Sequence, residues 1–373
     1  MKFLFVSGLY PTPESPGYGS FVKRQADALR ALGHQVEVVA NTDRRTGTLP
    51  ALRKYASLYA RARKAAAQGS YDLVVGHFLY PNAGIARAAA RIAQTPYVVV
   101  AHGTDVASLA RADFLAAWSR QACEQADGVV AVSRALLRQL EEAVTLREQT
   151  PRAVINMGID TSVFHPRPRA QSRATLGLED KARVVVVVGN LATVKGPDRA
   201  LEACRPLLES GALDRLVFVG DGELRGMLEQ AAAAAGLSGQ VVFAGHCEPE
   251  VVATWLTAAD LMLLASRNEG LGLVILEAQA CGTPVAAARV GGVPEVLAPE
   301  PAGYQLDPLD VSSWTGVISS MLTQRESDPG SPREARRAQT NATANSAAQR
   351  AREFAEFSYQ VINRDLSKTD SLL

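Results

Sequence analysis

The pattern of hydrophobic and polar residues predicts short buried strands alternating with amphipathic helices in the first half of the chain. Five apolar runs have the length of buried strands: 2–7, 35–40, 71–77, 96–101 and 127–132. Residues 21–32 carry apolar positions at helical spacing, and Gly33 is placed to end that helix. Ser133 is a good N-cap for a helix over 134–146. A strand–helix–strand opening of this kind predicts a Rossmann-like domain with a parallel sheet.

The second half of the chain repeats this pattern. Four further apolar runs, each followed by a glycine-containing loop, read as buried strands: 183–188, 216–219, 241–244 and 259–265. The last run leads into an apolar helix over 273–281, which Gly282 is placed to end and which Pro284 prevents from continuing. These elements predict a second Rossmann-like domain.

Length and composition describe a globular protein of two domains, 1–164 and 165–348, joined at a short, polar, proline-containing segment. The chain of 373 residues is 47% hydrophobic and 21% charged, and its net charge of +1 gives no overall attraction to nucleic acid. The four cysteines contain no C-x-x-C pair, which favours reduced thiols over a zinc site. No apolar run approaches the roughly 20 residues of a membrane-spanning helix, and the N-terminal run is too short for a signal peptide. We therefore expect a cytoplasmic protein.

The loop that begins the helix over 273–281 has the chemistry of a ligand site. Gly270 and Gly272 let the backbone approach a ligand, and the N–H groups that open a helix favour an anion. Glu269 and Glu277 flank this anion site, and carboxylates accept hydrogen bonds from hydroxyl groups. A ligand that suits this pattern carries a diphosphate in the middle and sugar hydroxyls at both ends, which is the structure of a nucleotide sugar. The alternative is a glycine turn beside two solvated glutamates, although an unpaired Glu277 in an apolar helix would be costly.

A second glycine-containing loop precedes the helix over 21–32. Gly17 and Gly19 place their backbone where it could face a diphosphate at the helix N-terminus. A dinucleotide-binding site is the alternative, since Glu37 falls roughly where a ribose-binding acid would. That alternative is disfavoured because the loop lacks the third glycine and is long and rich in proline.

The second-domain motif resembles the donor-site signature of the retaining glycosyltransferases of family 4. The resemblance rests on two glutamates separated by seven residues, on the pattern Ala-x-Ala-x-Gly-x-Pro-Val over 278–285, and on Gly-Gly-Val-Pro-Glu at 291–295. It implies the GT-B fold, with two Rossmann-like domains facing each other across a cleft. The second domain would bind the nucleotide sugar and the first the acceptor. The resemblance also implies independence of metal ions and of any cofactor beyond the donor substrate.

The end of the chain fits the same family. Residues 323–345 are rich in Ser, Thr, Arg, Asn and Pro, which predicts a mobile excursion. A final helix over 349–365 resembles the terminal helix of the family, which crosses back to pack on the first domain. The third segment of the chain, 349–373, would thus be this helix and a frayed tail over its last eight residues.

The resemblance assigns roles to particular residues. His102, in His-Gly-Thr-Asp at a strand end, would contact the donor sugar near the reacting carbon; a packed structural histidine and a general base are the alternatives. Lys195 matches the family's phosphate-binding lysine, and Asn190 stands where an arginine is usual, so Lys195 would stabilise most of the leaving-group charge. Glu269 would position the transferred sugar through its hydroxyls, and Glu277 would bind the ribose. The loop residues Gly270, Leu271 and Gly272 would bind the donor, with the helix start at Gly270–Gly272 facing the diphosphate.

The reaction implied is the transfer of a hexose-type sugar, with retention of anomeric configuration, to a hydroxyl of a sugar or lipid-linked acceptor. The sequence leaves open whether the donor carries uridine, guanosine or adenosine diphosphate. Three other functions stay open: an epimerase of the same fold, a nucleotide-sugar-binding protein without catalysis, and a dinucleotide-dependent oxidoreductase. The spacing of the two glutamates argues against the first and the last. Asp221 and Glu223 suggest a metal, but the chain holds no D-x-D motif.

A predicted helix over 49–68 is basic, with arginines and lysines beside tyrosines. The simpler interpretation is a solvated helix face. The alternative is peripheral contact with an anionic membrane or a lipid-phosphate acceptor, in keeping with the family's role in envelope polysaccharide and glycolipid synthesis.

Overall fold

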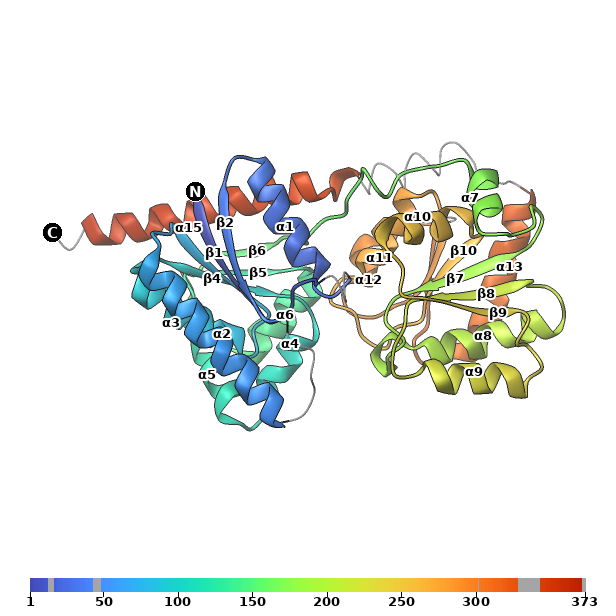
Figure 1. Ribbon diagram of the computed structural model, residues 1–373, viewed down its shortest axis with the longest axis horizontal. Helices are drawn as coiled ribbons and strands as arrows, with labels where there is room; N and C mark the ends of the chain where they lie inside the picture. Colours follow the sequence, from blue (N-terminus) through green and yellow to red (C-terminus); the bar gives the residue numbers. More distant parts are fainter. Residues whose placement is uncertain (13–16, 43–47, 301, 328–342, 371–373) are drawn as a thin grey trace. The chain divides into compact units, whose positions relative to one another are not determined.

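The computed structural model describes residues 1–12, 17–42, 48–300, 302–327 and 343–370 and divides the chain into two compact units (Figure 1). The first unit is Met1–Gly158 together with Ala347–Leu373, and the second is Ile159–Ser346. Each unit contains one six-stranded parallel sheet. The division falls within a few residues of positions 164 and 348.

The sheet of the first unit has the strand order β2-β1-β3-β4-β5-β6. Its strands are β1 (Lys2–Ser7), β2 (Gln35–Ala40), β3 (Leu73–His77), β4 (Tyr97–Ala101), β5 (Gly128–Ala131) and β6 (Arg152–Val154). The central strands β3, β4 and β5 are buried at every residue and rich in valine, as expected for a parallel sheet covered on both faces. The predicted βαβ opening is confirmed, with β1 and β2 at the expected bounds.

Helices cover both faces of this sheet (Figure 1). α1 (Ser20–Ala31) and α15 (Ala347–Asp370) pack together on one face. α2 (Thr48–Gln68), α3 (Asn82–Ala93) and α5 (Phe114–Glu124) pack side by side on the other. Shorter helices complete the unit: α4 (Thr104–Ala107), η1 (Ser108–Ala110) and α6 (Arg134–Ala143). Ser133 caps α6, its Oγ accepting from the N–H of Leu136 at 3.1 Å, but α6 ends three residues earlier than the pattern predicts.

The terminal helix α15 belongs to the core of the first unit. The ring of Phe354 lies 6.2 Å from that of Phe3 and 6.4 Å from that of Phe5. At Gly128 an added Cβ would lie 2.8 Å from a methyl group of Val361, so only glycine lets the helix approach β5 this closely. The helix extends to Asp370, beyond the predicted end at residue 365.

The sheet of the second unit has the order β12-β11-β10-β7-β8-β9. Its strands are β7 (Val184–Val188), β8 (Arg215–Val219), β9 (Val241–Gly245), β10 (Leu261–Leu264), β11 (Val285–Ala288) and β12 (Gly303–Leu306). α8 (Pro197–Glu209) contacts α9 (Arg225–Ala234) and α13 (Trp314–Ser327) on one face. α10 (Pro249–Ala258) contacts α7 (Arg169–Thr175) and α11 (Leu273–Ala280) on the other. Three short helices lie in loops: η2 (Thr193–Lys195), α12 (Val293–Val296) and η3 (Val311–Ser313).

Part of the expected excursion over 323–345 is helical. α13 extends to Ser327, so its last turn takes up the first residues of that segment. Residues 328–342 of that segment lie outside the described residues.

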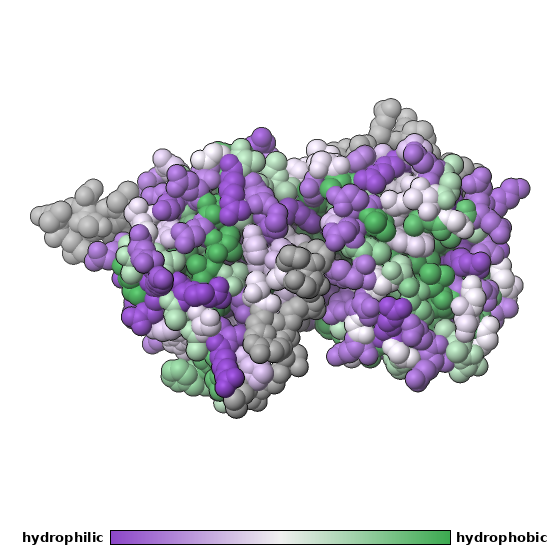
Figure 2. Space-filling model, in the orientation of Figure 1, coloured by the Kyte–Doolittle hydropathy of each residue, from purple (hydrophilic) through white to green (hydrophobic). Residues whose placement is uncertain are grey.

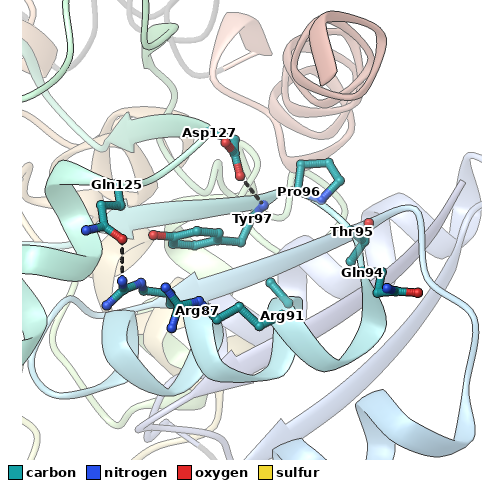
Figure 3. A pocket seen from close by; sticks show the side chains of 9 residues that line it. Arg87, Arg91, Gln94, Thr95, Pro96, Tyr97, Gln125 and Asp127 are labelled. Atoms are coloured by element: carbon teal, nitrogen blue, oxygen red, sulfur yellow. Dashed lines mark hydrogen bonds between the residues drawn. The ribbon is translucent and has the colours of Figure 1, made fainter. Parts of the chain in front are cut away.

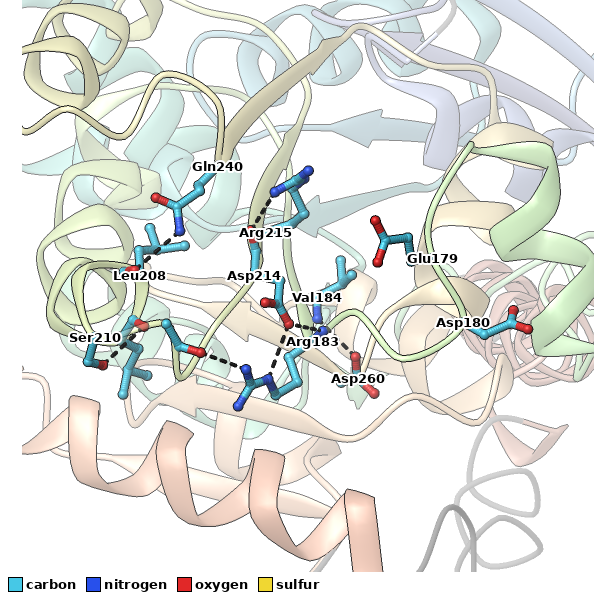
Figure 4. Close-up of polar contacts among 12 residues, drawn as sticks. Glu179, Asp180, Arg183, Val184, Leu208, Ser210, Asp214, Arg215, Gln240 and Asp260 are labelled. Atoms are coloured by element: carbon cyan, nitrogen blue, oxygen red, sulfur yellow. Dashed lines mark hydrogen bonds and ion pairs between the residues drawn. The ribbon is translucent and has the colours of Figure 1, made fainter.

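Polar side chains close the amino-terminal edge of both sheets. In the first unit the N–H of Tyr97 donates to Asp127 at 3.1 Å, beside a pocket that Arg87 and Gln125 also line (Figure 3). In the second unit the N–H of Val184 donates to Asp260 at 2.9 Å, and the N–H of residue 183 donates to Asp214 at 2.7 Å (Figure 4). Loops with ligand chemistry therefore have to be sought at the opposite, carboxyl edge.

The strand order marks one place on each carboxyl edge. In the first sheet β1 lies between β2 and β3, and in the second β7 lies between β10 and β8. The chain leaves these first strands in opposite directions, and ligands of open α/β sheets bind at such a reversal. The loops after β1 and β3 meet this condition in the first unit, with the loop after β4 next to them, and those after β7 and β10 meet it in the second.

The face of the molecule in Figure 2 is mainly hydrophilic, with apolar residues in small patches. On α2, the side chains of Leu58, Ala62 and Ala66 are buried at helical spacing, while those of Arg53 and Arg63 are exposed. Among the helices of the described residues, none combines the length and the apolar character needed to cross a bilayer.

Candidate functional site

The loops after β7 and β10 form one connected structure in the second unit. The guanidinium of Arg267 donates to both carboxylate oxygens of Asp198, at 2.8 and 2.5 Å, and to the carbonyl of Thr193 at 2.9 Å. Its N–H donates to the carbonyl of Val194 at 2.8 Å. A bidentate arginine–carboxylate pair fixes orientation as well as distance. The end of η2 is therefore held against the β10 loop.

A glycine lets these loops approach so closely. Gly196 adopts φ +62, and an added Cβ would lie 2.2 Å from the carbonyl oxygen of Ala265. No other residue fits there without moving backbone. Gly196 also precedes Pro197, the first residue of α8, so the loop passes directly into a helix.

Lys195 and Glu269 meet where the two loops join. The Lys195 Nζ lies 2.7 Å from the Glu269 Oε1, although 74 positions separate them in sequence. The same oxygen accepts a hydrogen bond of 2.7 Å from the Oγ of Ser266, which is fully buried. Only 8% of Glu269 is exposed, whereas the lysine side chain is 38% exposed. The carboxylate is thus fixed in place, and the ammonium group is open to a ligand.

The start of α11 adds backbone donors beside this pair. Gly272 adopts φ +86 at the N-cap position, and no side chain caps the helix. The first N–H groups of a helix lack partners within it and attract anions. Gly270 and Leu271 form the connection between Glu269 and this helix start, and Leu271 is buried. The structure therefore brings Lys195, Glu269 and the glycine loop together.

Backbone packing behind Glu269 fixes its position further. Gly291 adopts φ +50, and an added Cβ would lie 1.8 Å from the carbonyl oxygen of Glu269. The N–H of Gly292 donates to that same oxygen at 3.3 Å. Gly291 and Gly292 therefore pack against the backbone of the loop that follows β10.

Glu277 lies in the second turn of α11 and is half-buried. Burial, and to a smaller degree the Glu277 carboxylate, raises the pKa of Cys281 one turn further on. Glu277 and Cys281 are four positions apart, a spacing that places both on one face of the helix. The apolar character of α11 does not bury this carboxylate completely.

Asn190 follows β7 and is exposed. Its Oδ1 would lie 2.6 Å from a Cβ added at Gly222, so the amide rests on the glycine loop that follows β8. Arg225, the first residue of α9, and Arg267, in the loop after β10, are both paired with nearby carboxylates.

Asp221, which the sequence suggested as a metal ligand, forms hydrogen bonds with residues that follow it in the chain. It accepts from the N–H of Gly222 at 2.7 Å and from Arg225 at 3.0 Å. Within the described ranges, no group of three or more His, Cys, Asp or Glu residues is arranged to hold a metal ion.

In the first unit, Gly17 and Gly19 lie in the turn that opens α1. Gly19 adopts φ +75, and an added Cβ would lie 2.7 Å from the backbone of Leu9. The turn therefore packs directly against the loop that follows β1. Gly17 is exposed, and α1 has no side-chain cap. Both glycines thus lie at an uncapped helix start, the position predicted from the sequence.

His102 follows β4 and is held by its neighbours on several sides. Its ring centroid lies 4.5 Å from that of Phe78 and 5.0 Å from that of Phe21. Its Nε2 lies 3.1 Å from the Nδ1 of His77, which ends the adjacent strand β3 and is fully buried. Burial lowers the pKa of His102 to about 3 and lowers that of His77 well below its usual value. Both rings are therefore neutral near pH 7.

Asp105 organises the backbone around His102. Its carboxylate accepts from the N–H groups of Leu79 at 3.0 Å, His102 at 3.1 Å and Gly103 at 2.6 Å. These contacts join the loops after β3 and β4. Burial raises the pKa of Asp105 despite the hydrogen bonds that lower it. The sequence had suggested only a favourable helix-dipole position for this residue.

Backbone strain occurs next to this pair. Phe78 adopts φ +65, in the left-handed region that bulky residues rarely occupy. Strained residues of this kind persist where the surroundings fix them, and they cluster at ligand sites.

The sequence analysis assigned no role to three residues that the structure places at these sites: His77, Phe78 and Ser266. The only available signal for His77 was its place at a strand end.

Comparison with known proteins relates both halves of the chain to glycosyltransferases. Residues 17–163 match the family model described as Glycosyltransferase Family 4, and residues 168–343 match the model described as Glycosyl transferases group 1. The chain is 32% identical over 287 residues to a D-inositol 3-phosphate glycosyltransferase of Acidothermus cellulolyticus, covering 72% of this chain and 62% of that protein. It is 30% identical over 268 residues to an N-acetyl-alpha-D-glucosaminyl L-malate synthase of Bacillus anthracis, covering 71% and 68%.

The fold has solved counterparts. The crystal structure of HepE from Anabaena in complex with UDP and glucose superposes with a TM-score of 0.75 at 22% identity, covering 95% of this chain and 98% of that chain. At this identity the similarity concerns the fold, which is GT-B. Two consecutive family models and a relative of 30% identity covered over two thirds of its length settle the family. The chain belongs to glycosyltransferase family 4.

Proposed function

We propose that this protein is a retaining glycosyltransferase that moves a hexose-type sugar from a nucleotide-diphosphate sugar to a hydroxyl group of an acceptor. The observation that carries the proposal is the contact of 2.7 Å between Lys195 and Glu269 at the point where the β7 and β10 loops join. A cation suited to a diphosphate and a carboxylate suited to sugar hydroxyls stand side by side there.

Lys195 has the capacity to stabilise the leaving diphosphate. An ammonium group carries three N–H donors, and the contact with Glu269 uses one of them. The remaining donors, with the N–H groups that open α11, would meet the charge that develops on the phosphate oxygens. Asn190 offers only a neutral amide to the same ligand, so most of the positive charge would come from Lys195.

Glu269 would bind the transferred sugar. Its Oε1 accepts from Lys195 and Ser266, and within the described chain Oε2 accepts no hydrogen bond. A fixed carboxylate oxygen of this kind suits the hydroxyls of a hexose. Glu277, half-buried in the second turn of α11, would accept from the ribose hydroxyls. Gly17 and Gly19 in the first unit are proposed to contribute backbone donors to the same diphosphate, and His102 to contact the transferred sugar.

A uridine diphosphate sugar is the first donor to test. HepE was crystallised with UDP-glucose, and guanosine and adenosine diphosphate sugars form the rest of the panel. The acceptor panel takes D-inositol 3-phosphate and L-malate from the names of the relatives, together with lipid-linked sugars. Transfer without added metal is proposed, and a chelator in every assay tests it.

A thermal-shift screen with UDP-, GDP- and ADP-sugars, with NAD as a control, tests donor binding. A ligand that binds only the native state raises the melting temperature with its concentration. A rise with one nucleotide sugar, followed by acceptor-dependent transfer with retained configuration, supports the proposal. Release of an epimerised sugar without acceptor would identify an epimerase, and binding without any turnover would identify a sensor. A rise with NAD alone would refute the donor site.

Contact with anionic lipid through α2 is proposed as well. Arg53, Arg61, Arg63 and Lys64 are exposed on this helix, while its buried side packs on the first unit. Basic residues beside tyrosines suit a lipid headgroup surface, and such binding weakens with salt. Sedimentation with vesicles that contain anionic lipid tests it, and equal binding to neutral vesicles would contradict it.

A further inference from the structure

The inference concerns the two histidines at the carboxyl ends of β3 and β4, and it deepens the proposed function of His102. We propose that His77 is a positioning residue that fixes His102 in the Nδ1–H tautomer. His102 then acts toward a ligand as a hydrogen-bond donor through Nδ1 and not as a proton acceptor. The ligand group that it recognises is an oxygen acceptor, such as a hydroxyl or carbonyl oxygen of a bound sugar.

The hydrogen bond between the two rings carries one proton. The His77 Nδ1 and the His102 Nε2 lie 3.1 Å apart, which is hydrogen-bonding distance. Each neutral imidazole has one N–H donor and one bare acceptor nitrogen. Two arrangements are therefore possible: His77 donates from Nδ1 to His102, or His102 donates from Nε2 to His77.

The surroundings of His77 distinguish the two arrangements. His77 is fully buried, and its Nε2 has no hydrogen-bond partner within the described residues. If His102 donated, the proton of His77 would sit on that Nε2, and a buried N–H group would go unsatisfied. Buried N–H groups without partners are rarer than buried acceptors without partners. The ring of Phe5, with its centroid 4.6 Å from that of His77, offers only a weak acceptor face.

The favoured arrangement has His77 donating from Nδ1 to the Nε2 of His102. The backbone of His77 is fixed, since its carbonyl oxygen accepts a hydrogen bond of 2.8 Å from the Nδ2 of Asn82. The Nε2 of His102 is then occupied as an acceptor, and its proton lies on Nδ1. Within the described chain no hydrogen bond reaches that Nδ1, and His102 is only partly buried. The free donor is thus available to a ligand.

This assignment separates two roles for His102. A general base needs a bare nitrogen that faces the substrate. Here the bare nitrogen faces His77, and the nitrogen left for a ligand already carries a proton. The low pKa values that burial gives both rings agree with this, because neither ring gains a second proton near pH 7.

Nuclear magnetic resonance of protein labelled with ¹⁵N-histidine tests the tautomer directly. The chain holds five histidines, so single substitutions assign each ring. We expect the His102 Nδ1 and the His77 Nδ1 to be protonated, and both Nε2 atoms to be bare. A protonated Nε2 on His102 in the wild-type protein would overturn the inference. This readout needs no substrate.

Two variants test the positioning role. His77→Asn keeps an N–H donor near the position of Nδ1, whereas His77→Phe removes the donor and keeps a ring of similar shape. We expect His77→Phe to show a mixture of His102 tautomers and to lower kcat/KM by on the order of tenfold, the worth of one neutral hydrogen bond. His77→Asn should keep the Nδ1–H tautomer and most of the activity. Equal tautomer spectra for wild type and His77→Phe would refute the role.

The tests keep the two proposals apart. If the tautomer is as stated and no glycosyl transfer is found, the proposed function fails and the inference stands. If transfer is found while His102 carries its proton on Nε2, the inference fails and the proposed function stands.

Discussion

Replacing Gly291 by alanine tests whether the glycine pair holds Glu269 in place. The added Cβ would lie 1.8 Å from the carbonyl oxygen of Glu269, against backbone that cannot rotate away. Either the β10 loop or the turn at 291–292 must move by more than 1 Å to reach an ordinary contact of about 3.4 Å. Movement of the β10 loop would carry the Glu269 carboxylate away from Lys195.

Gly282→Ala is the matched control. Gly282 also has a positive φ, +79, it ends α11 in the same unit, and an added Cβ would meet nothing within 4 Å. The left-handed conformation costs alanine about 1–2 kcal/mol at either position. The clash at Gly291 adds about 1–3 kcal/mol, the usual cost of overpacking. For a domain of about 150–250 residues, the added term lowers the melting temperature by about 2–12 °C beyond the control.

Thermal unfolding and donor kinetics of the two variants check this reasoning. We expect Gly282→Ala to keep the donor KM near that of wild type. We expect Gly291→Ala to lower kcat/KM for the donor by up to about a hundredfold, since a displacement of 1 Å in a site can cost that much. If the two variants lose equal stability and Gly291→Ala keeps the wild-type kcat/KM, then Gly291 does not position Glu269.

Further predictions concern individual charges and protons. Lys195→Met should lower kcat about a hundredfold by removing a donor to the leaving group, while Lys195→Arg should retain part of the activity in a steady-state assay. Ser266→Ala should cost about 1–3 kcal/mol in chemical unfolding, because the buried Glu269 carboxylate loses one of its two partners; an unchanged midpoint would contradict this. His77 has its folded pKa below the unfolded value of 6.5, so its contribution to stability is complete above pH 6.5 and declines as pH falls. The wild type should therefore lose up to about 2 kcal/mol between pH 6.5 and pH 5 that His77→Phe does not lose, as measured by urea unfolding at both pH values.

Much of the architecture could be read from local sequence. The bounds of β1 and β2 match the apolar runs that predict them, and Ser133 caps α6 as its side chain suggests. Strand length, helical periodicity and capping depend on residues only a few positions apart, so the sequence displays them directly. The candidate ligand loop at 269–272 was visible for the same reason. Glu269, Gly272 and Glu277 lie within nine positions of each other, and their spacing on a loop and a helix needs no tertiary information.

The contacts that turn these residues into a site were decided by the tertiary structure. Lys195 and Glu269 are 74 positions apart and meet only because β7 and β10 are neighbours in the sheet. His77 and His102 meet because β3 lies beside β4, and no periodicity in the sequence relates them. Strand order is set by the packing of whole elements and by which helices cover each face, so no local pattern encodes it. The sequence therefore determined which chemical groups stand at the ends of the strands, and the order of the strands determined which of them touch.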